Sequence, residues 1–189
     1  MNKPARTFIA VKIEPEEELI RTITILKKSL GDEAINWVDP NNLHLTLKFL
    51  GDTSTVQIEE IKRLLGNITV NHQSFQLTLS GLEFFKNKGQ PRVLFACVYD
   101  FLPLELLFSE IDRKLIDIGF ESETRKFKPH LTLARIKHIS NKKHFYQVTD
   151  KLKNTNLQKS TISEVIFYKS NLTSKGPVYN ELFAAKLRS

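Results

Sequence analysis

The sequence predicts an α+β protein built from two related halves. Its apolar residues alternate with the strand period in some segments and recur with the helix period in others. The order of these segments lacks the strict strand–helix alternation that is typical of a doubly wound parallel sheet. In addition, the tetrapeptide His-Leu-Thr-Leu occurs twice, at residues 44–47 and 130–133. Internal similarity at a wide spacing usually means two related structural units.

Strands and helices are distributed along the whole chain. Strands are expected where β-forming residues alternate with polar ones, at residues 6–13, 43–50, 75–85, 92–99, 129–136, 161–170 and 178–187. Helices are expected where apolar residues share one face, at residues 15–30, 53–65, 102–118 and 142–152. Gly and Pro predict turns at residues 86–91 and 174–177. No linker divides the chain, so residues 1–189 are expected to form one domain made of two lobes.

The bulk composition restricts the function only loosely. The 28 Lys and Arg residues exceed the 21 Asp and Glu residues, for a net charge of +7. A positive field attracts polyanions such as nucleic acid, although basicity alone is equally compatible with a role in solubility. Cys97 is the only cysteine and lies in an apolar run, which predicts a buried structural thiol. No run reaches the length of a signal-peptide core or a membrane span, so a cytoplasmic protein without membrane contact is expected.

The duplicated tetrapeptide repeats one arrangement of side chains. On a strand, the first and third residues of each copy (His44 and Thr46, His130 and Thr132) share one face, and the two leucines share the other. Each leucine pair is expected to belong to a core. A single histidine on a strand is more often a structural polar residue than a catalyst. Packing gives no reason to repeat the histidine on the polar face of a second strand, so the repetition predicts a functional pair.

Two histidines and two threonines suit displacement at a phosphodiester. Histidine changes charge near neutral pH, so one copy can be a base while the other is an acid. Each threonine hydroxyl can donate a hydrogen bond to a non-bridging phosphate oxygen. The sequence has no His-Glu-x-x-His, no second cysteine, no Walker-type loop and no Gly-x-Ser-x-Gly. The sequence therefore predicts a phosphodiesterase that uses neither a metal nor a cofactor.

The two motifs and their surroundings resemble the 2H phosphoesterase superfamily, and within it the bacterial RNA 2′,3′-cyclic phosphodiesterase family, formerly called 2′-5′ RNA ligases. The similar segments are residues 6–11, 37–38, 42–51, 91–95, 127–135 and 170–179. The resemblance implies a bilobal fold, in which two pseudo-symmetric antiparallel-sheet lobes with outer helices surround a central cleft. One motif would lie on each lobe.

The resemblance also implies roles that the residues alone leave open. His44 would donate a proton to the leaving 3′ oxygen, and His130 would accept a proton from the attacking water. The product would be a 2′-phosphate. Thr46 and Thr132 would bind the phosphate, with Arg135 as a further phosphate ligand. Strict strand alternation turns Arg135 toward the leucine face, so it needs a bend to reach the cleft.

Several neighbouring side chains have simpler expected roles. Lys48 shares the predicted face of His44 and Thr46, and we expect it to be exposed and solvated. Phe49, Phe127 and Tyr179 are candidates for stacking on a base, with core packing as the default expectation for all three.

Two alternative functions remain open from the sequence. The same residues could form or cleave 2′-5′ linkages, in RNA or in small nucleotides. A non-catalytic RNA-binding module is the other alternative, but stacking and charge would suffice for binding alone, so the intact histidines and threonines favour catalysis. The expected partners are RNA ends or small cyclic nucleotides, and the expected state is a monomer.

Overall fold

Two antiparallel sheets form the framework of the computed structural model, which describes residues 4–174 and 176–189. The first sheet has the strand order β3-β1-β8-β9. Its strands are β3 (His44–Thr53), β1 (Ala5–Lys12), β8 (Glu164–Thr173) and β9 (Gly176–Lys186). The second sheet has the order β2-β6-β5-β4-β7. Its strands are β2 (Ala34–Trp37), β6 (His130–His138), β5 (Gln90–Tyr99), β4 (Phe75–Asn87) and β7 (Asn156–Ile162).

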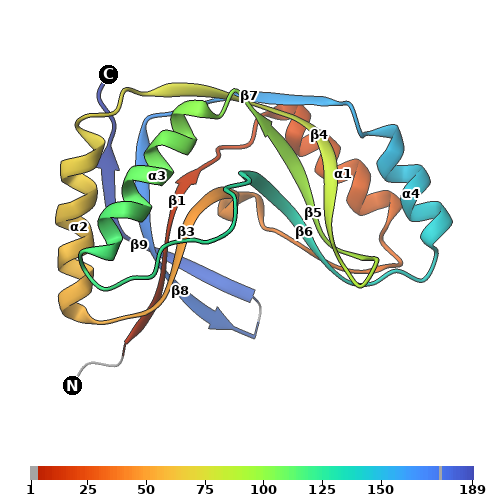
Figure 1. Ribbon diagram of the computed structural model, residues 1–189. Helices are drawn as coiled ribbons and strands as arrows, with labels where there is room; N and C mark the ends of the chain where they lie inside the picture. The colour runs from red at the N-terminus through yellow and green to blue at the C-terminus, as the bar shows by residue number, and fades with distance from the viewer. Residues whose placement is uncertain (1–3, 175) are drawn as a thin grey trace.

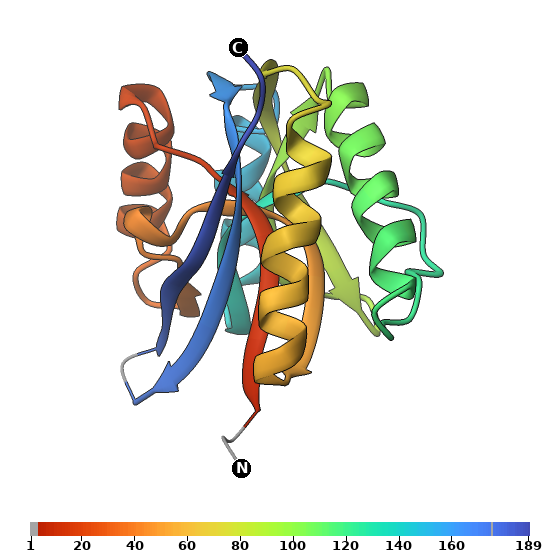
Figure 2. The same ribbon diagram turned by 90° about the vertical axis from the view of Figure 1, so that its left-hand side faces the viewer.

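Helices cover the outer face of each sheet and so define two lobes (Figure 1, Figure 2). Helices α2 (Thr55–Thr69) and α3 (Leu102–Ile116) pack on the first sheet, and α1 (Glu17–Ser29) and α4 (Lys142–Lys151) pack on the second. A short 3₁₀ helix, Pro40–Asn42, separates β2 from β3. In Figure 1 the lobes open like a V, with β3 and β6 at its centre. The predicted α+β bilobal architecture is confirmed.

The leucines of both tetrapeptides are buried, as predicted. Leu45, Leu47, Leu131 and Leu133 are at most 5% exposed. They belong to the apolar core that extends beneath the outer helices. Because burial of apolar surface is the main force that drives folding, these leucines fix which face of each strand points inward. The histidine and threonine of each copy are thereby held on the opposite face.

Local sequence signals explain where several elements begin. The hydroxyl of Ser54 accepts a hydrogen bond from the backbone N–H of Gln57, and the Gln57 side chain accepts one from the N–H of Ser54. This capping box satisfies donors that the first turn of α2 leaves free. Glu17 and Glu18 lie in the first turn of α1, where carboxylates complement the helix dipole.

The strand expected at residues 161–170 corresponds to β8, but its expected start falls in the end of β7, a strand of the other sheet. β7 ends at Ile162 and β8 begins at Glu164. The inward face of β7 carries the buried polar side chains of Gln158 and Ser160. The sequence of β7 therefore does not show the alternation of apolar and polar residues that predicts a strand. The side-chain amide of Gln158 donates hydrogen bonds to the carbonyl of Glu14 at 3.0 Å and to Ser160 Oγ at 2.7 Å. The buried amide nitrogen therefore has hydrogen-bond partners.

Two other differences are smaller. β2 was not expected, since it has only four residues and pairs with β6 alone. The expected turn at residues 174–177 coincides with the β8–β9 hairpin, and its Lys175 lies outside the described residues. None of the helices in the described ranges is long and apolar enough to cross a membrane.

Candidate functional site

The two His-Leu-Thr-Leu segments open β3 and β6, and each strand contains a β-bulge at the last leucine. In the pairing of β1 with β3, the residues on either side of Leu47 face consecutive residues of β1, so Leu47 has no partner of its own. Leu133 is bypassed in the same way in the pairing of β5 with β6. A bulge re-aims the residues that follow it. The sequence repeat is therefore also a repeat of backbone geometry.

The bulges decide where the next side chains point. Arg135 reaches the wall of the same cavity as His130 and Thr132, which strict alternation would have prevented. On β3 the equivalent shift brings Phe49 to the cavity with 66% of its surface exposed, so core packing is the wrong expectation for this ring. Lys48 turns into the interior instead and is only 8% exposed. The expectation of a solvated Lys48 is wrong.

A cavity of about 920 Å³ unites the two motifs. His44 and Thr46 line it from the first lobe, and His130, Thr132 and Arg135 line it from the second. The cavity wall continues along three further segments. Strand β2 contributes Asn36 and Trp37, the residue that caps the 3₁₀ helix contributes Asp39, and the β8–β9 hairpin contributes Thr173 and Tyr179. A cavity of this size lies within the range of small-ligand and cofactor sites.

Both imidazoles are oriented by the same backbone contact. His44 Nδ1 lies 2.7 Å from the carbonyl oxygen of Asn42, and His130 Nδ1 lies 2.9 Å from that of Lys128. In each case the carbonyl belongs to the second residue before the histidine. A carbonyl only accepts hydrogen bonds, so Nδ1 must carry the proton in both rings. Nε2 of each ring is therefore the nitrogen left for a substrate.

Aromatic side chains hold each imidazole in place. The ring of His44 packs against Phe8 and Tyr179, with centroid distances of 5.1 and 5.3 Å. The ring of His130 forms a T-shaped contact with Phe85, with a centroid distance of 4.7 Å. It forms a second T-shaped contact with Phe95. Such packing restricts ring rotation, because the neighbouring rings leave few alternative rotamers. The two histidines are thus positioned before any ligand binds.

Phe127, another aromatic candidate, is partly buried and packs against the core. Its ring stacks on that of Phe108 at a centroid distance of 4.2 Å and an interplanar angle of 8°. Core packing is therefore the correct expectation for Phe127, whereas Tyr179 both packs against His44 and lines the cavity.

Burial lowers the pKa of both histidines below the ordinary value of 6.5. The carbonyl hydrogen bonds oppose this shift, while positive charges reinforce it. Arg135 lowers the pKa of both rings, and Lys128 further lowers the pKa of His130. Both rings are mainly neutral at pH 7 in this state. A bound anion would favour the imidazolium form and move the pKa upward.

Two other titratable groups near the histidines stay protonated. Burial raises the pKa of the Tyr179 hydroxyl and of the Cys97 thiol. Cys97 is the cross-strand neighbour of His130, yet its raised pKa disfavours the thiolate that nucleophilic chemistry needs. Within residues 4–174 and 176–189, no cluster of three or more His, Cys, Asp or Glu side chains could hold a metal ion.

Residues 11–95 and 102–179 match the model of the LigT-like phosphoesterase family. The chain belongs to this family. It is 34% identical over 174 residues to an RNA 2′,3′-cyclic phosphodiesterase of Methanocaldococcus jannaschii, which covers 92% of this chain and 96% of the relative. It is 32% identical to the enzyme of the same name from Thermotoga maritima, over 94% of this chain and 93% of the relative. The expected membership of the 2H phosphoesterase superfamily, and within it of the RNA 2′,3′-cyclic phosphodiesterase family, is confirmed.

Solved structures share the fold of this LigT-like phosphoesterase. A Thermus thermophilus protein superposes with a TM-score of 0.80 at 27% identity, covering 97% of this chain and 98% of its own. Escherichia coli LigT in complex with 3′-AMP superposes with a TM-score of 0.79 at 24% identity, covering 98% and 99% of the two chains. The bilobal arrangement is thus shared with proteins of low sequence identity.

Parts of the cavity wall of this LigT-like phosphoesterase were not identified from the sequence. Asn36 belongs to the short strand β2, which the patterning did not reveal. Lys137 also lines the cavity. Its spacing of two residues from Arg135 is a usable signal, since residues two apart on a strand share a face.

Proposed function

We propose that this LigT-like phosphoesterase is an RNA 2′,3′-cyclic phosphodiesterase that hydrolyses a terminal 2′,3′-cyclic phosphate to a 2′-phosphate. The observation that carries the proposal is the convergence of both His-Leu-Thr-Leu segments on one cavity. Each half supplies an oriented imidazole and a threonine, and the second half adds Arg135. The relatives that bear the name of this activity support the same conclusion.

The reaction needs one proton acceptor and one proton donor on opposite sides of phosphorus. His130 Nε2 removes a proton from the attacking water as the new P–O bond forms. His44, as the imidazolium, gives its Nε2 proton to the 3′ oxygen as the P–O3′ bond breaks. The product then carries a 3′ hydroxyl and a 2′-phosphate. Proton exchange with solvent returns both rings to their starting states.

The equatorial phosphate oxygens need donors while charge builds up on them. Thr46 and Thr132 provide neutral hydroxyls from the two sides of the cavity, and Arg135 provides a cation. The donor role of His44 and the acceptor role of His130 follow the family resemblance. The Lys128 cation supports this assignment, because it favours the neutral form of His130 that a base requires.

The substrate class is RNA ends or small cyclic nucleotides. The exposed ring of Phe49 on the cavity wall offers a surface on which an unpaired base can stack. The net charge of +7 attracts a polyanion over a distance. Thr173 and Tyr179 of the β8–β9 hairpin add polar groups to the far wall.

We also infer that residues 1–189 act as one two-lobed domain, as a monomer in the cytoplasm and without a metal or cofactor. In support, a single chain supplies all of the proposed catalytic and phosphate-binding residues. Cys97 is the only cysteine, so the 189 residues form no internal disulfide, which is usual for proteins of reducing compartments.

The test uses an oligoribonucleotide that ends in a 2′,3′-cyclic phosphate, incubated with the protein in EDTA. The expected product is a terminal 2′-phosphate, identified against 2′- and 3′-phosphate standards. A 3′-phosphate would contradict the assignment of the leaving oxygen. Activity that disappears in EDTA and returns with a divalent cation would contradict the metal-independent mechanism.

A further inference from the structure

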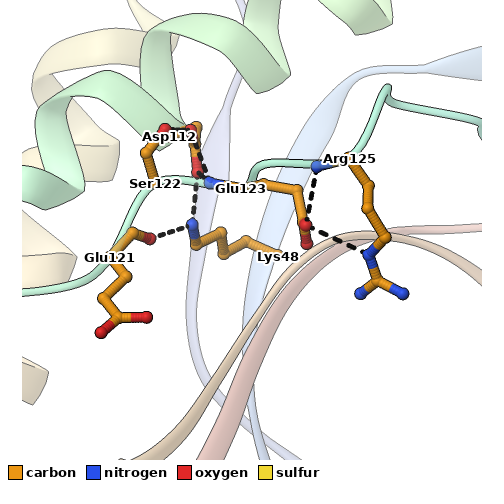
Figure 3. Close-up of polar contacts among 6 residues, drawn as sticks. All are labelled: Lys48, Asp112, Glu121, Ser122, Glu123 and Arg125. Atoms are coloured by element: carbon orange, nitrogen blue, oxygen red, sulfur yellow. Dashed lines mark hydrogen bonds and ion pairs between the residues drawn. The ribbon is translucent and has the colours of Figure 1, made fainter.

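Directly after the bulge of β3, Lys48 enters a buried polar network between α3 and the loop of residues 117–129 (Figure 3). Its ammonium group forms an ion pair with the carboxylate of Asp112 on α3. It also donates a hydrogen bond to the carbonyl oxygen of Glu121, at 2.5 Å. The side chains of Lys48 and Asp112 are only 8% and 11% exposed. The pair is therefore largely removed from water.

The same carboxylate also holds the loop. Asp112 accepts a hydrogen bond from Ser122 Oγ at 2.6 Å and from the backbone N–H of Glu123 at 3.2 Å. Burial raises the pKa of Asp112, but the hydrogen bonds from Lys48 and Ser122 outweigh it and hold the pKa below its ordinary value of 3.8. Asp112 is thus ionised at neutral pH. One charged group connects β3, α3 and the loop.

The loop of residues 117–129 carries the chain from the first lobe to the second. It follows α3, which packs on the first sheet, and it ends at His130 at the start of β6 (Figure 1). The loop contains no helix or strand. Ordering a long loop without regular structure costs conformational entropy, so its position depends on the hydrogen bonds and ion pairs that hold it to the rest of the fold.

A displacement of this loop would directly change the orientation of the His130 ring. The carbonyl of Lys128, within the loop, accepts the hydrogen bond from His130 Nδ1. At the other end of the network, Lys48 is two residues beyond Thr46 on the strand that begins with His44. The network therefore links the two strands that carry the proposed acid and base.

Stability alone does not account for a buried ion pair. Replacement of such a pair by apolar residues of similar volume is often neutral or stabilising, because the charges lose their hydration on folding. Directional hydrogen bonds, in contrast, fix the relative position of the groups that they join. The hydrogen bonds of Lys48 and Asp112 fix the position of β3, which carries His44, relative to the loop that leads to His130.

We propose that Lys48 is a positioning residue for the reaction, and that through Asp112 it fixes the strand of His44 relative to the loop that orients His130. The proposal rests on the phosphodiesterase function proposed above. Small misplacement of reacting groups is costly in enzymes, and about 1 Å can lower the rate about 100-fold. A purely structural pair would affect folding without a separate effect on turnover.

The experiment compares Lys48→Met, the double variant Lys48→Met/Asp112→Leu, and the control Lys62→Met. The control breaks the exposed Lys62–Glu59 pair on α2 and should change nothing. Lys48→Met should lower Tm, since it leaves a buried carboxylate without its cation. The double variant should recover part of the lost Tm, because no unpaired buried charge remains although Ser122 and the Glu123 N–H lose their acceptor. Its kcat should stay about 10–100-fold below wild type with KM little changed.

A second readout follows the loop itself. Hydrogen exchange at the backbone amides of residues 121–125 should be faster in the double variant, because Glu123 N–H has lost its acceptor. If the double variant does not fold, Lys48→Met/Asp112→Asn takes its place, since it keeps an acceptor oxygen for the loop but removes both charges.

Wild-type turnover is measured first, and its absence would contradict the phosphodiesterase function itself. With an active wild type, a folded double variant with wild-type kcat would overturn the positioning role alone. An increase in KM at unchanged kcat would overturn it as well, because that pattern is typical of a lost substrate contact.

Discussion

Phe49 and Arg135 occupy matching places in the two halves of the molecule: each is the second residue after a bulged leucine, and each faces the cavity. The halves therefore repeat a geometry while differing in chemistry at the same position. One half places an aromatic ring beside its histidine and threonine, and the other places a guanidinium. A pseudo-symmetric scaffold thus produces an asymmetric site, which suits a substrate with a base at one end and a phosphate at the other.

His44→Ala and His130→Ala should each lower kcat by about 10²–10⁴-fold with the fold intact, the usual effect of a positioned acid or base. The loss in the double variant should be smaller than the product of the two single losses, because the residues act as a unit. Steady-state kinetics and Tm measurements check both points. His138→Ala, at the exposed end of β6, is the matched control. Near-normal turnover of either single variant would contradict the pair.

The pH dependence should be bell-shaped and displaced toward acid. In the free enzyme the pKa of both histidines is lowered from 6.5. The form with one imidazolium and one neutral imidazole therefore accumulates below pH 6.5. We expect kcat/KM to rise as the pH falls from 8 and to reach its maximum below about 6.5. The maximum of kcat should lie at higher pH, since the bound anion raises the pKa values. The two apparent constants belong to the pair.

Arg135→Gln should raise KM by about 10–100-fold, the effect of losing a charge-assisted hydrogen bond to phosphate. It should also move the optimum of kcat/KM to higher pH. The sign follows from the Arg135 cation, which lowers the pKa of both histidines, so its removal lets both pKa values rise. The control is Arg63→Gln on the exposed face of α2. An unchanged pH optimum would place Arg135 outside the site.

Phe49→Ala should weaken the binding of nucleotides but not of inorganic phosphate. Loss of a base–aromatic stack costs about 1–3 kcal/mol, so KM for a cyclic nucleotide should rise about 5–150-fold. Titration calorimetry with phosphate alone tests the second half of the prediction. Equal losses for both ligands would indicate that Phe49 supports the cavity wall instead of contacting a base.

Helices and strands whose apolar residues recur with a regular period could be predicted from the sequence. Those with polar residues at buried positions could not. The helix expected at residues 102–118 is present as Leu102–Ile116, because its apolar face is continuous in sequence. β7 was partly missed because Gln158 and Ser160 point inward, and their burial depends on partners far along the chain, such as Glu14. No local pattern reveals such partners.

The sequence by itself determined which side chains we propose for the chemistry. Strand alternation is local, so the repeat alone placed His44 and His130 opposite their leucines and beside their threonines. Only the tertiary structure decided that Arg135 faces the cavity and that Lys48 is buried. Both outcomes follow from the bulges at Leu47 and Leu133. A bulge arises from the register between two neighbouring strands, and that register is set by contacts between residues far apart in the sequence.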